Sequence, residues 1–434
     1  MTLAEDDQTR DDSPAPAAPA GRLRRAARVA LADITPLRTS RDYRRVWFGQ
    51  TVSTVGQQMT AVAVSIQVYT ITGSTFATGL VGLFSLVPLV VFGLYGGAVA
   101  DTVDRRMLGL IGSLGLALLS VVLAVETMLG FDRVAVLYGV VALQAVCFSV
   151  SYPARSSMIP RLVPAAQLPA ANALNSVGTT FGAMAGPMLG GVLIGLWGFH
   201  AAYLVDTVAF TAVLYAMCRL PPMRPEGDRK GRASVLEGLR FLRKRPNLRL
   251  SFLADLVAMI FGMPRALFPA IAVGFYGGDA RTVGLLTAAP AVGSLAGALL
   301  SGWVGRVHRH GLAVIFAVLA WGLAITGFGL ARELWLGLLL LGAAGCADTA
   351  SMIFRNTMMQ MAAPDEMRGR LQGIFIVVVT GGPRLGDLAS GSIGELTSPA
   401  FSVVSGGLAC IAGILLLAAL SPGFSRYDAR HPTP

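Results

Sequence analysis

The sequence contains few charged residues for its length. Only 14% of its 434 residues are Asp, Glu, Lys or Arg, whereas 54% are hydrophobic and the mean hydropathy is +0.63. A soluble fold of this size needs a more polar surface, so the composition excludes an ordinary soluble protein. Apolar stretches of about 20 residues, the length that crosses a bilayer, recur from Trp47 nearly to Ser421.

Cysteines are scarce, and their spacing matches neither a disulfide framework nor a metal site. We interpret all four as small buried hydrophobic residues: Cys147, Cys218, Cys346 and Cys410. The chain also lacks the GxxxxGK[ST], HExxH and GxSxG motifs, which argues against an ATP-driven pump and the membrane hydrolases that carry such motifs. We therefore expect no enzymatic activity, no metal and no cofactor.

The first 20 residues lack an apolar segment behind a basic start, so they do not form a secretory signal. They are acidic and then rich in Pro and Ala, which is typical of a disordered tail. Four arginines follow, interleaved with apolar residues: Arg22, Arg24, Arg25 and Arg28. This cluster is either a short helix lying on anionic lipid or a solvated basic linker.

Apolar runs separated by short polar segments predict twelve membrane helices. The expected spans are 44–71, 74–100, 106–129, 133–157, 167–196, 199–219, 248–276, 281–303, 311–330, 333–361, 367–395 and 399–420. A cytoplasmic N-terminus places 30 of the 35 Lys and Arg residues on the cytoplasmic side, and only Arg133, Arg281 and Arg332 outside. The positive-inside rule therefore predicts two cytoplasmic termini, and it explains the net charge of +11 without nucleic acid.

A basic linker containing several prolines divides the twelve helices into six and six. The expected organisation is a tail with a basic juxtamembrane segment (1–40), a first bundle (41–219), the linker (220–247), a second bundle (248–420) and a cytoplasmic tail (421–434). Matched strings indicate a tandem repeat: Arg155 and Pro164 against Arg355 and Pro364, and GPMLG (186–190) against GPRLG (382–386). The sequence thus predicts an all-α membrane fold of two pseudo-symmetric six-helix bundles.

The segment GGAVADTVDRR, at 96–106, resembles the signature that joins helices 2 and 3 in the major facilitator superfamily. Gly97 would let a neighbouring helix approach, and Asp101 would accept hydrogen bonds from the N-terminus of the eleventh helix. Such a polar latch can break and re-form. Arg105 and Arg106 would hold the cytoplasmic face, or serve only as positive-inside anchors.

Glycines recur every four residues along the fifth expected helix, with a proline and a further glycine beside them: Gly178, Gly182, Gly186, Pro187, Gly190 and Gly191. Stripes of this kind let helix backbones approach closely in lipid. The string GAMAGPMLGG resembles the antiporter motif of drug-exporting major facilitators. Plain helix packing without a gating role is the alternative.

The resemblance to the major facilitator superfamily extends from about Thr35 to Pro422 and favours its enterobactin exporter and drug–proton antiporter branch. It is carried by VAVSIQVYTITGSTFATGL (62–80), PRALFPAIA (264–272) and MMQMAAPDEMRGRLQG (358–373). It implies a rocker-switch exporter of siderophores or amphipathic drugs, driven by protons, in the bacterial inner membrane. We expect it to work as a monomer in contact with lipid.

Few polar groups lie inside the apolar helices, and a charge there costs several kcal/mol unless it is paired or wetted. In the family that this sequence resembles, helices 1, 4, 7 and 10 line the cavity. The candidates for substrate or proton binding are Gln57, Gln58, Gln144, Asp255, Arg265 and Asp348, with Arg384 and Asp387 on the eleventh helix. Asp255 and Asp348 are favoured as proton sites because a low dielectric favours a protonated carboxyl.

Structural alternatives stay open for several of these groups. Arg384 and Asp387, three residues apart, could neutralise each other. Asp206 could accept a hydrogen bond between helices, and Gln57 and Gln58 could join helices together.

Arg155 and Arg355 lie near the cytoplasmic ends of their helices and are expected to snorkel or cap. An importer, or a membrane sensor with the same fold, is the alternative function. The sequence predicts neither the substrate nor the direction of transport.

Overall fold

The computed structural model describes residues 33–100, 103–223, 240–243, 245–362 and 365–427, which form helices and connecting loops with no strand among them. The first helices are α2 (Thr35–Thr39), α3 (Arg41–Thr72), α4 (Thr75–Ala100), α5 (Arg105–Met128), α6 (Val134–Leu162), η1 (Ala165–Gln167), α7 (Leu168–Trp197) and α8 (Phe199–Cys218). The later helices are α10 (Pro246–Phe261), η2 (Arg265–Leu267), α11 (Phe268–Tyr276), α12 (Ala280–Leu299), η3 (Ser301–Arg306), α13 (His310–Leu330), α14 (Leu334–Ala362), α15 (Asp365–Leu396), α16 (Pro399–Leu420) and α17 (Pro422–Ser425).

The long helices agree with the expected spans to within a few residues, apart from one break. The span expected at 248–276 is interrupted between α10 and α11, where Gly262 ends α10 and the short η2 turn follows Pro264. Proline lacks the amide hydrogen that a continuous helix would use, which explains the interruption. The break places Arg265 at the start of the η2 turn.

Ten helices within the described part of the chain are long and apolar enough to cross a membrane. The helices α3 and α15 are long as well, with 32 residues each. Both contain more polar residues, and in α3 these are mainly glutamines and threonines within an otherwise apolar helix. The expected count of twelve membrane helices therefore stays a prediction.

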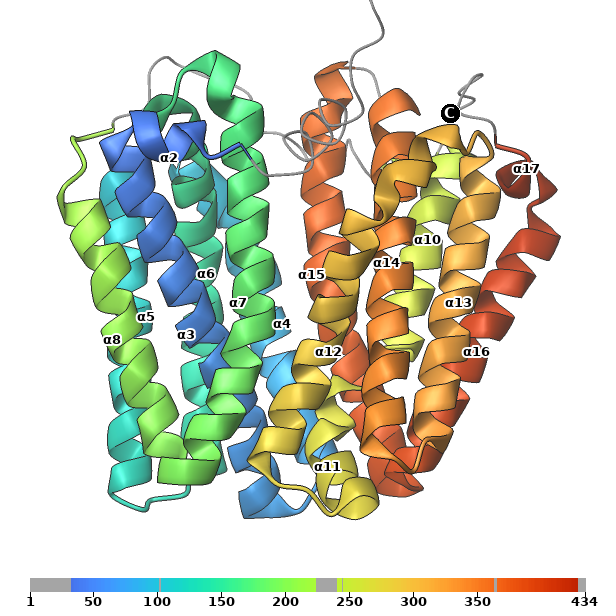
Figure 1. Ribbon diagram of the computed structural model, residues 1–434, viewed down its shortest axis with the longest axis horizontal. Helices are drawn as coiled ribbons and strands as arrows, with labels where there is room; N and C mark the ends of the chain where they lie inside the picture. Colours follow the sequence, from blue (N-terminus) through green and yellow to red (C-terminus); the bar gives the residue numbers. More distant parts are fainter. Residues whose placement is uncertain (1–32, 101–102, 224–239, 244, 363–364, 428–434) are drawn as a thin grey trace, which may run out of the picture.

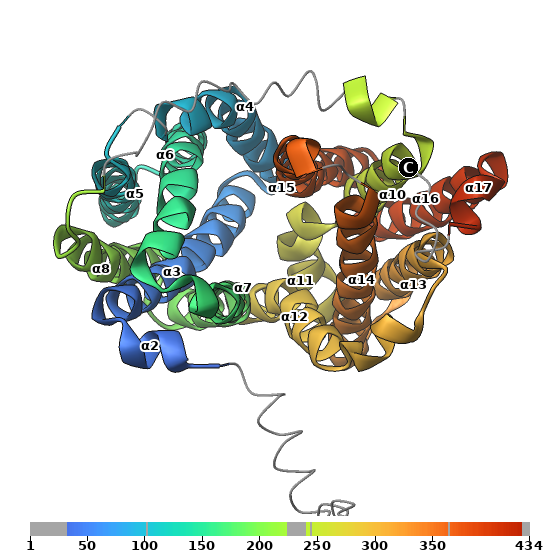
Figure 2. The ribbon, with the colours of Figure 1, turned by 90° about the horizontal axis from the view of Figure 1, so that it is seen from above.

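The helices α3–α8 lie on one side of the molecule and α10–α16 on the other, and we call these the first and second helix groups (Figure 1). At one end lie α2 and α17, which we call the terminal end, and at the other lies α11, which we call the far end. The groups meet along two helix pairs, α4 with α15 and α7 with α12 (Figure 2).

Glycines allow these two helix pairs to approach closely near the far end. A Cβ added at Gly79 would lie 2.6 Å from the carbonyl oxygen of Asp387, and one at Gly391 would lie 2.5 Å from that of Thr75. In the other pair, a Cβ at Gly191 would lie 2.5 Å from the Ala280 carbonyl oxygen. Since these neighbours are backbone atoms that cannot rotate away, only glycine permits this packing.

The repeated glycine strings make equivalent contacts in the two groups. A Cβ added at Gly190 on α7 would lie 3.2 Å from the Cα of Met59 on α3. Gly386 on α15 faces the backbone of Met259 on α10 in the same way. The separation of 200 residues between Met59 and Met259 equals that between Arg155 and Arg355, which aligns α3 with α10 and α6 with α14.

Candidate functional site

Three adjoining cavities lie along α3, and together we call them the central cavity. Their volumes are about 240, 260 and 300 Å³, and Gln58 lines all three. The helix α3 runs from the terminal end to the far end, so the α3 residues that line each cavity show its position. We call the cavities the terminal compartment (about 240 Å³), the middle compartment (about 300 Å³) and the far compartment (about 260 Å³). The combined space suits a ligand of drug-like size.

A polar face of α3 forms one wall of the central cavity. Its residues recur at three- and four-residue spacing: Gln50, Thr54, Gln57, Gln58, Ala61 and Ser65. The predicted substrate candidates Gln57 and Gln58 therefore line the cavity, as does Gln144 on α6 in the middle compartment. The polar residues that make α3 less apolar thus serve to line the cavity.

Arg155 on α6 lines the terminal compartment beside Tyr152 and Asn175. Only 7% of it is exposed, and it donates a hydrogen bond to the hydroxyl of Ser151 at 3.5 Å. No acid of the described chain lies within ion-pair distance of it. The expectation that this arginine snorkels or caps is wrong, because its position faces an interior cavity.

The equivalent Arg355 on α14 is also buried, with 4% exposed, but it is paired. Its Nη1 forms an ion pair with Asp255 on α10, and its Nη2 lies 3.8 Å from Asp348 on its own helix. Neither acid is among the residues that line the central cavity. The structure therefore joins these two predicted proton candidates to one arginine inside the second helix group.

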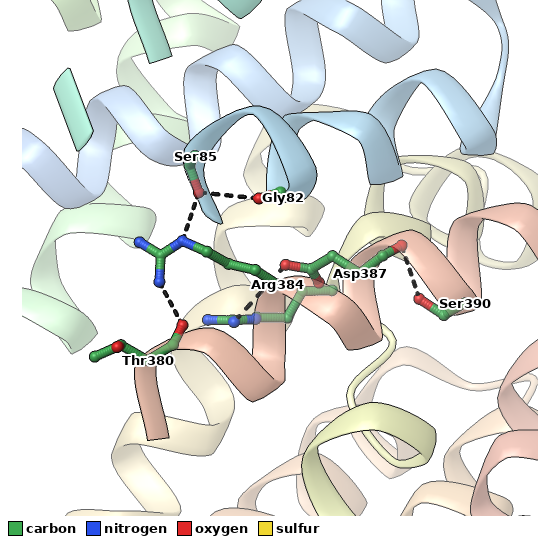
Figure 3. A network of polar contacts seen from close by, with 7 residues as sticks. Gly82, Ser85, Thr380, Arg384, Asp387 and Ser390 are labelled. Atoms are coloured by element: carbon green, nitrogen blue, oxygen red, sulfur yellow. Dashed lines mark hydrogen bonds and ion pairs between the residues drawn. The ribbon is translucent and has the colours of Figure 1, made fainter. Parts of the chain in front are cut away.

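Arg265, Arg384 and Asp387 line the far compartment. Arg384 donates from Nε to the hydroxyl of Ser85 on α4, in the other helix group, and from Nη1 to the Thr380 carbonyl oxygen (Figure 3). Asp387 lies 3.8 Å from the guanidinium of Arg265. Arg265, rather than Arg384, is thus the ion-pair partner of Asp387 among the described residues, and Arg384 instead bonds to α4 in the other helix group.

Asp206 on α8 is fully buried, with 0% exposed, and lines the middle compartment. One oxygen, Oδ2, accepts hydrogen bonds from Thr60 at 2.6 Å and Ser120 at 2.7 Å. The other, Oδ1, faces Gly56 and has no hydrogen-bond partner in the described structure. The expected interhelical hydrogen bond is confirmed. Among the described residues, no cation forms an ion pair with Asp206.

The expected latch residue Asp101 lies outside the described residues, and so does the side-chain environment of Gly97. Arg105 and Arg106 begin α5 and contact other helices of the first group. Arg105 donates to the Ser157 carbonyl oxygen, and Arg106 donates to the last carbonyls of α8. Both arginines therefore bind backbone carbonyls at the terminal end, and Arg106 caps α8.

The glycine stripe on α7 is buried and has two neighbours. Gly182, Gly186 and Gly190 pack against α3, where an added Cβ at Gly182 would lie 2.6 Å from Thr54. Gly191 packs against α12, and the Pro187 carbonyl faces Gly284 of that helix. The stripe thus serves packing within the first group and contact with the second.

The four cysteines differ in their burial. Cys410 is buried, Cys147 and Cys346 are partly buried, and Cys218 is exposed, so the expectation of burial is wrong for Cys218. Within the described residues, no cluster of His, Cys, Asp or Glu has the composition of a metal site.

Comparison with known proteins gives consistent results over most of the chain. Residues 31–429 match the family model described as transmembrane secretion effector. The enterobactin exporter EntS of Citrobacter koseri is 28% identical over 410 residues, which cover 93% of this chain and 97% of that protein. EntS of Escherichia coli is 28% identical over 396 residues, covering 90% and 94%.

Solved structures share the fold at low sequence identity. A POT family transporter in complex with a thioalcohol-conjugated peptide has a TM-score of 0.70 at 10% identity, covering 88% of this chain and 96% of that chain. The nucleoside transporter NupG has a TM-score of 0.67 at 13% identity, covering 89% and 100%. A bacterial homologue of the human lysosomal transporter Spinster has a TM-score of 0.61 at 16% identity, covering 88% and 97%.

Proposed function

Because this chain belongs to the transmembrane secretion effector family of the major facilitator superfamily, we propose that it exports a small molecule from the bacterial cell by proton-driven alternating access. It is a multi-pass protein of the inner membrane and a transporter rather than an enzyme. The observation that carries the proposal is the central cavity, which has polar and charged walls inside a largely apolar helix assembly.

The substrate is a siderophore or another amphipathic compound. Support comes from the two enterobactin exporters, which match almost the whole chain. The cavity walls also suit such a molecule, because aromatic and aliphatic side chains alternate with glutamines and arginines.

The terminal end faces the cytoplasm in this proposal. Its support is the excess of Lys and Arg in the segments at that end, against three on the other side. The far end, where glycines hold the two helix groups together, then faces outward. A substrate would enter from the cytoplasm and leave when the α4–α15 and α7–α12 contacts open.

The two six-helix bundles tilt around the cavity, and a latch at Asp101 closes the cytoplasmic side in the outward-open state. The latch is a prediction from the sequence motif alone. A single chain suffices for this movement, because the cavity lies between two parts of one chain.

Asp206 carries the transported proton. An ionised carboxylate in an apolar interior is costly without a cation, whereas a protonated carboxyl is a neutral group that nearby hydroxyls can solvate. Asp255 and Asp348 lie beside Arg355, and Asp387 lies beside Arg265. Within the described part of the chain the partners of Asp206 are hydroxyl groups, from α3 and α5, and Asp206 lines the cavity that Arg384 also lines.

Uptake into inverted membrane vesicles tests the function. With an acid lumen, vesicles containing the protein should accumulate enterobactin or the amphipathic dye ethidium, and collapse of the gradient should stop accumulation. Accumulation of ethidium alone would support export of amphipathic compounds but contradict enterobactin as a substrate. No accumulation of either compound, or uptake that ignores the gradient, would contradict the proposal.

A further inference from the structure

Each helix group has one buried arginine that donates a hydrogen bond to the serine four residues earlier on the same helix. Arg155 donates to the hydroxyl of Ser151, four residues earlier, at 3.5 Å. Arg355 donates to the carbonyl oxygen of Ser351, also four residues earlier, at 3.4 Å. Both arginines are more than nine-tenths buried. The repeat therefore preserves the cation and its position on the helix.

The repeat does not preserve the acids. The partners of Arg355 are Asp255 and Asp348, and the 200-residue offset places Val55 and Phe148 at the equivalent positions of the first group. Met59 and Met259, also 200 residues apart, both pack against the glycine strings of α7 and α15, which supports the match of α3 with α10. The first group thus keeps the cation and has apolar residues in place of both anions.

A buried cation without an anion is costly, and its retention calls for an explanation. In the second group the charge is neutralised internally. In the first group the guanidinium lines a cavity whose terminal compartment also presents Tyr152, Asn175 and Gln50. These neighbours can donate or accept hydrogen bonds but carry no negative charge at neutral pH.

We propose that Arg155 is an anion-binding site, which takes an oxyanion of the substrate in the place that the two aspartates occupy beside Arg355. This inference rests on the proposed export function and specifies its substrate class. The fitting groups are a carboxylate, a phosphate or an ionised catechol. A guanidinium has five donors, and Ser151 uses one, so a planar oxyanion can bind through two parallel hydrogen bonds.

Substitution at Val55 gives a direct test, because it can copy the ion pair of the second group into the first. Val55→Asp places a carboxylate at the position that the repeat matches with Asp255, where we expect it to pair with Arg155. Val55→Asn is the matched control, because asparagine has nearly the same shape as aspartate and no charge. Arg155→Gln removes the cation and serves as the second variant if Val55→Asp does not fold. Thermal unfolding of each purified variant establishes that it is folded.

The probes are 2,3-dihydroxybenzoate and its methyl ester, which share a skeleton and differ in one negative charge. Binding is measured by isothermal titration calorimetry in nanodiscs of zwitterionic lipid. Wild-type protein and Val55→Asn should bind the acid about tenfold more tightly than the ester. Val55→Asp and Arg155→Gln should bind the two probes equally. A second series in nanodiscs with anionic lipid should give the same affinities.

Three results would overturn the inference. The first is wild-type protein that lacks a preference for the acid or binds neither probe. The second is a preference that survives in folded Val55→Asp or Arg155→Gln. The third is a loss of acid binding in anionic lipid, which would assign the site to a lipid headgroup. Binding is measured without a proton gradient. Anion binding at Arg155 and proton-driven export in vesicles can therefore succeed or fail independently.

Discussion

Glu395, near the end of α15, caps the first turn of α4 in the other helix group: its Oε2 accepts a hydrogen bond from the backbone amide of Thr75 at 2.8 Å. The same oxygen accepts from the Phe76 amide at 3.3 Å and from the Ser74 hydroxyl at 2.9 Å. A carboxylate at a helix N-terminus satisfies free amides and interacts favourably with the helix dipole. This contact joins the two groups at the far end.

Glu395→Ala should loosen the far end. Loss of a cap typically costs about 0.5–2 kcal/mol, enough to change the ratio of closed to open molecules severalfold. Spin labels at the exposed far-end residues Asp132 and Glu333, in a background without the native cysteines, should report a larger share of long distances. Ser392→Ala is the control, because its hydroxyl donates to the Leu388 carbonyl oxygen of the same helix. Equal distance distributions in both variants would show that Glu395 does not stabilise the closed far end.

Gly79→Ala should impair transport by preventing closure of the far end. The added methyl group would meet the Asp387 carbonyl oxygen at 2.6 Å, so α4 and α15 must separate. Gly93→Ala on the same helix is the control, because in the described structure no neighbouring helix comes within 4 Å of its added methyl group. Vesicle transport should fall about tenfold or more in the first variant, equivalent to about 1.4 kcal/mol, and stay unchanged in the second. Equal rates would show that close approach at Gly79 is not needed.

Asp255→Val should destabilise the protein strongly. Removal of the Asp255 carboxylate leaves the buried guanidinium of Arg355 with only the more distant acid, Asp348 at 3.8 Å, and should cost up to about 3–5 kcal/mol. The triple variant Asp255→Val/Asp348→Val/Arg355→Met removes all three charges of this cluster and should recover much of the loss. Asp42→Asn, in the more exposed Arg45–Asp42 pair, should cost less than about 1 kcal/mol. Thermal unfolding in detergent measures all three variants, and a triple variant no more stable than Asp255→Val would argue against the charge cluster.

Asp206→Asn should remove proton coupling while leaving the protein folded. The amide can keep hydrogen bonds with Thr60 and Ser120, but it cannot release a proton at physiological pH. We expect gradient-driven uptake to fall about tenfold or more and the remaining transport to lose its pH dependence. Glu126→Gln is the control, since Glu126 is another buried acid but does not line the central cavity. If transport by Asp206→Asn kept the pH dependence of the wild type, another group would have to carry the proton.

The sequence predicted helix positions well because long apolar runs and their polar breaks are local properties. The pairing of Asp255 with Arg355 depends on how α10 packs against α14, which no local pattern reveals. The expectation for Arg155 fails for a related reason: its place near the helix end predicts snorkelling, but neighbouring helices bury it beside an interior cavity. The offset of 200 residues between the two arginines is a usable signal, because it matches Asp255 of the second group with the apolar Val55 of the first.

Distances at both ends of the molecule test whether the helix groups move against each other around the central cavity. One spin-label pair joins Asp132 and Glu333 at the far end, and the other joins Arg219 and Arg309 at the terminal end. When enterobactin is added, the far-end distance should lengthen while the terminal-end distance shortens. Distances that stay fixed under every condition, or that change in the same direction at both ends, would contradict alternating access.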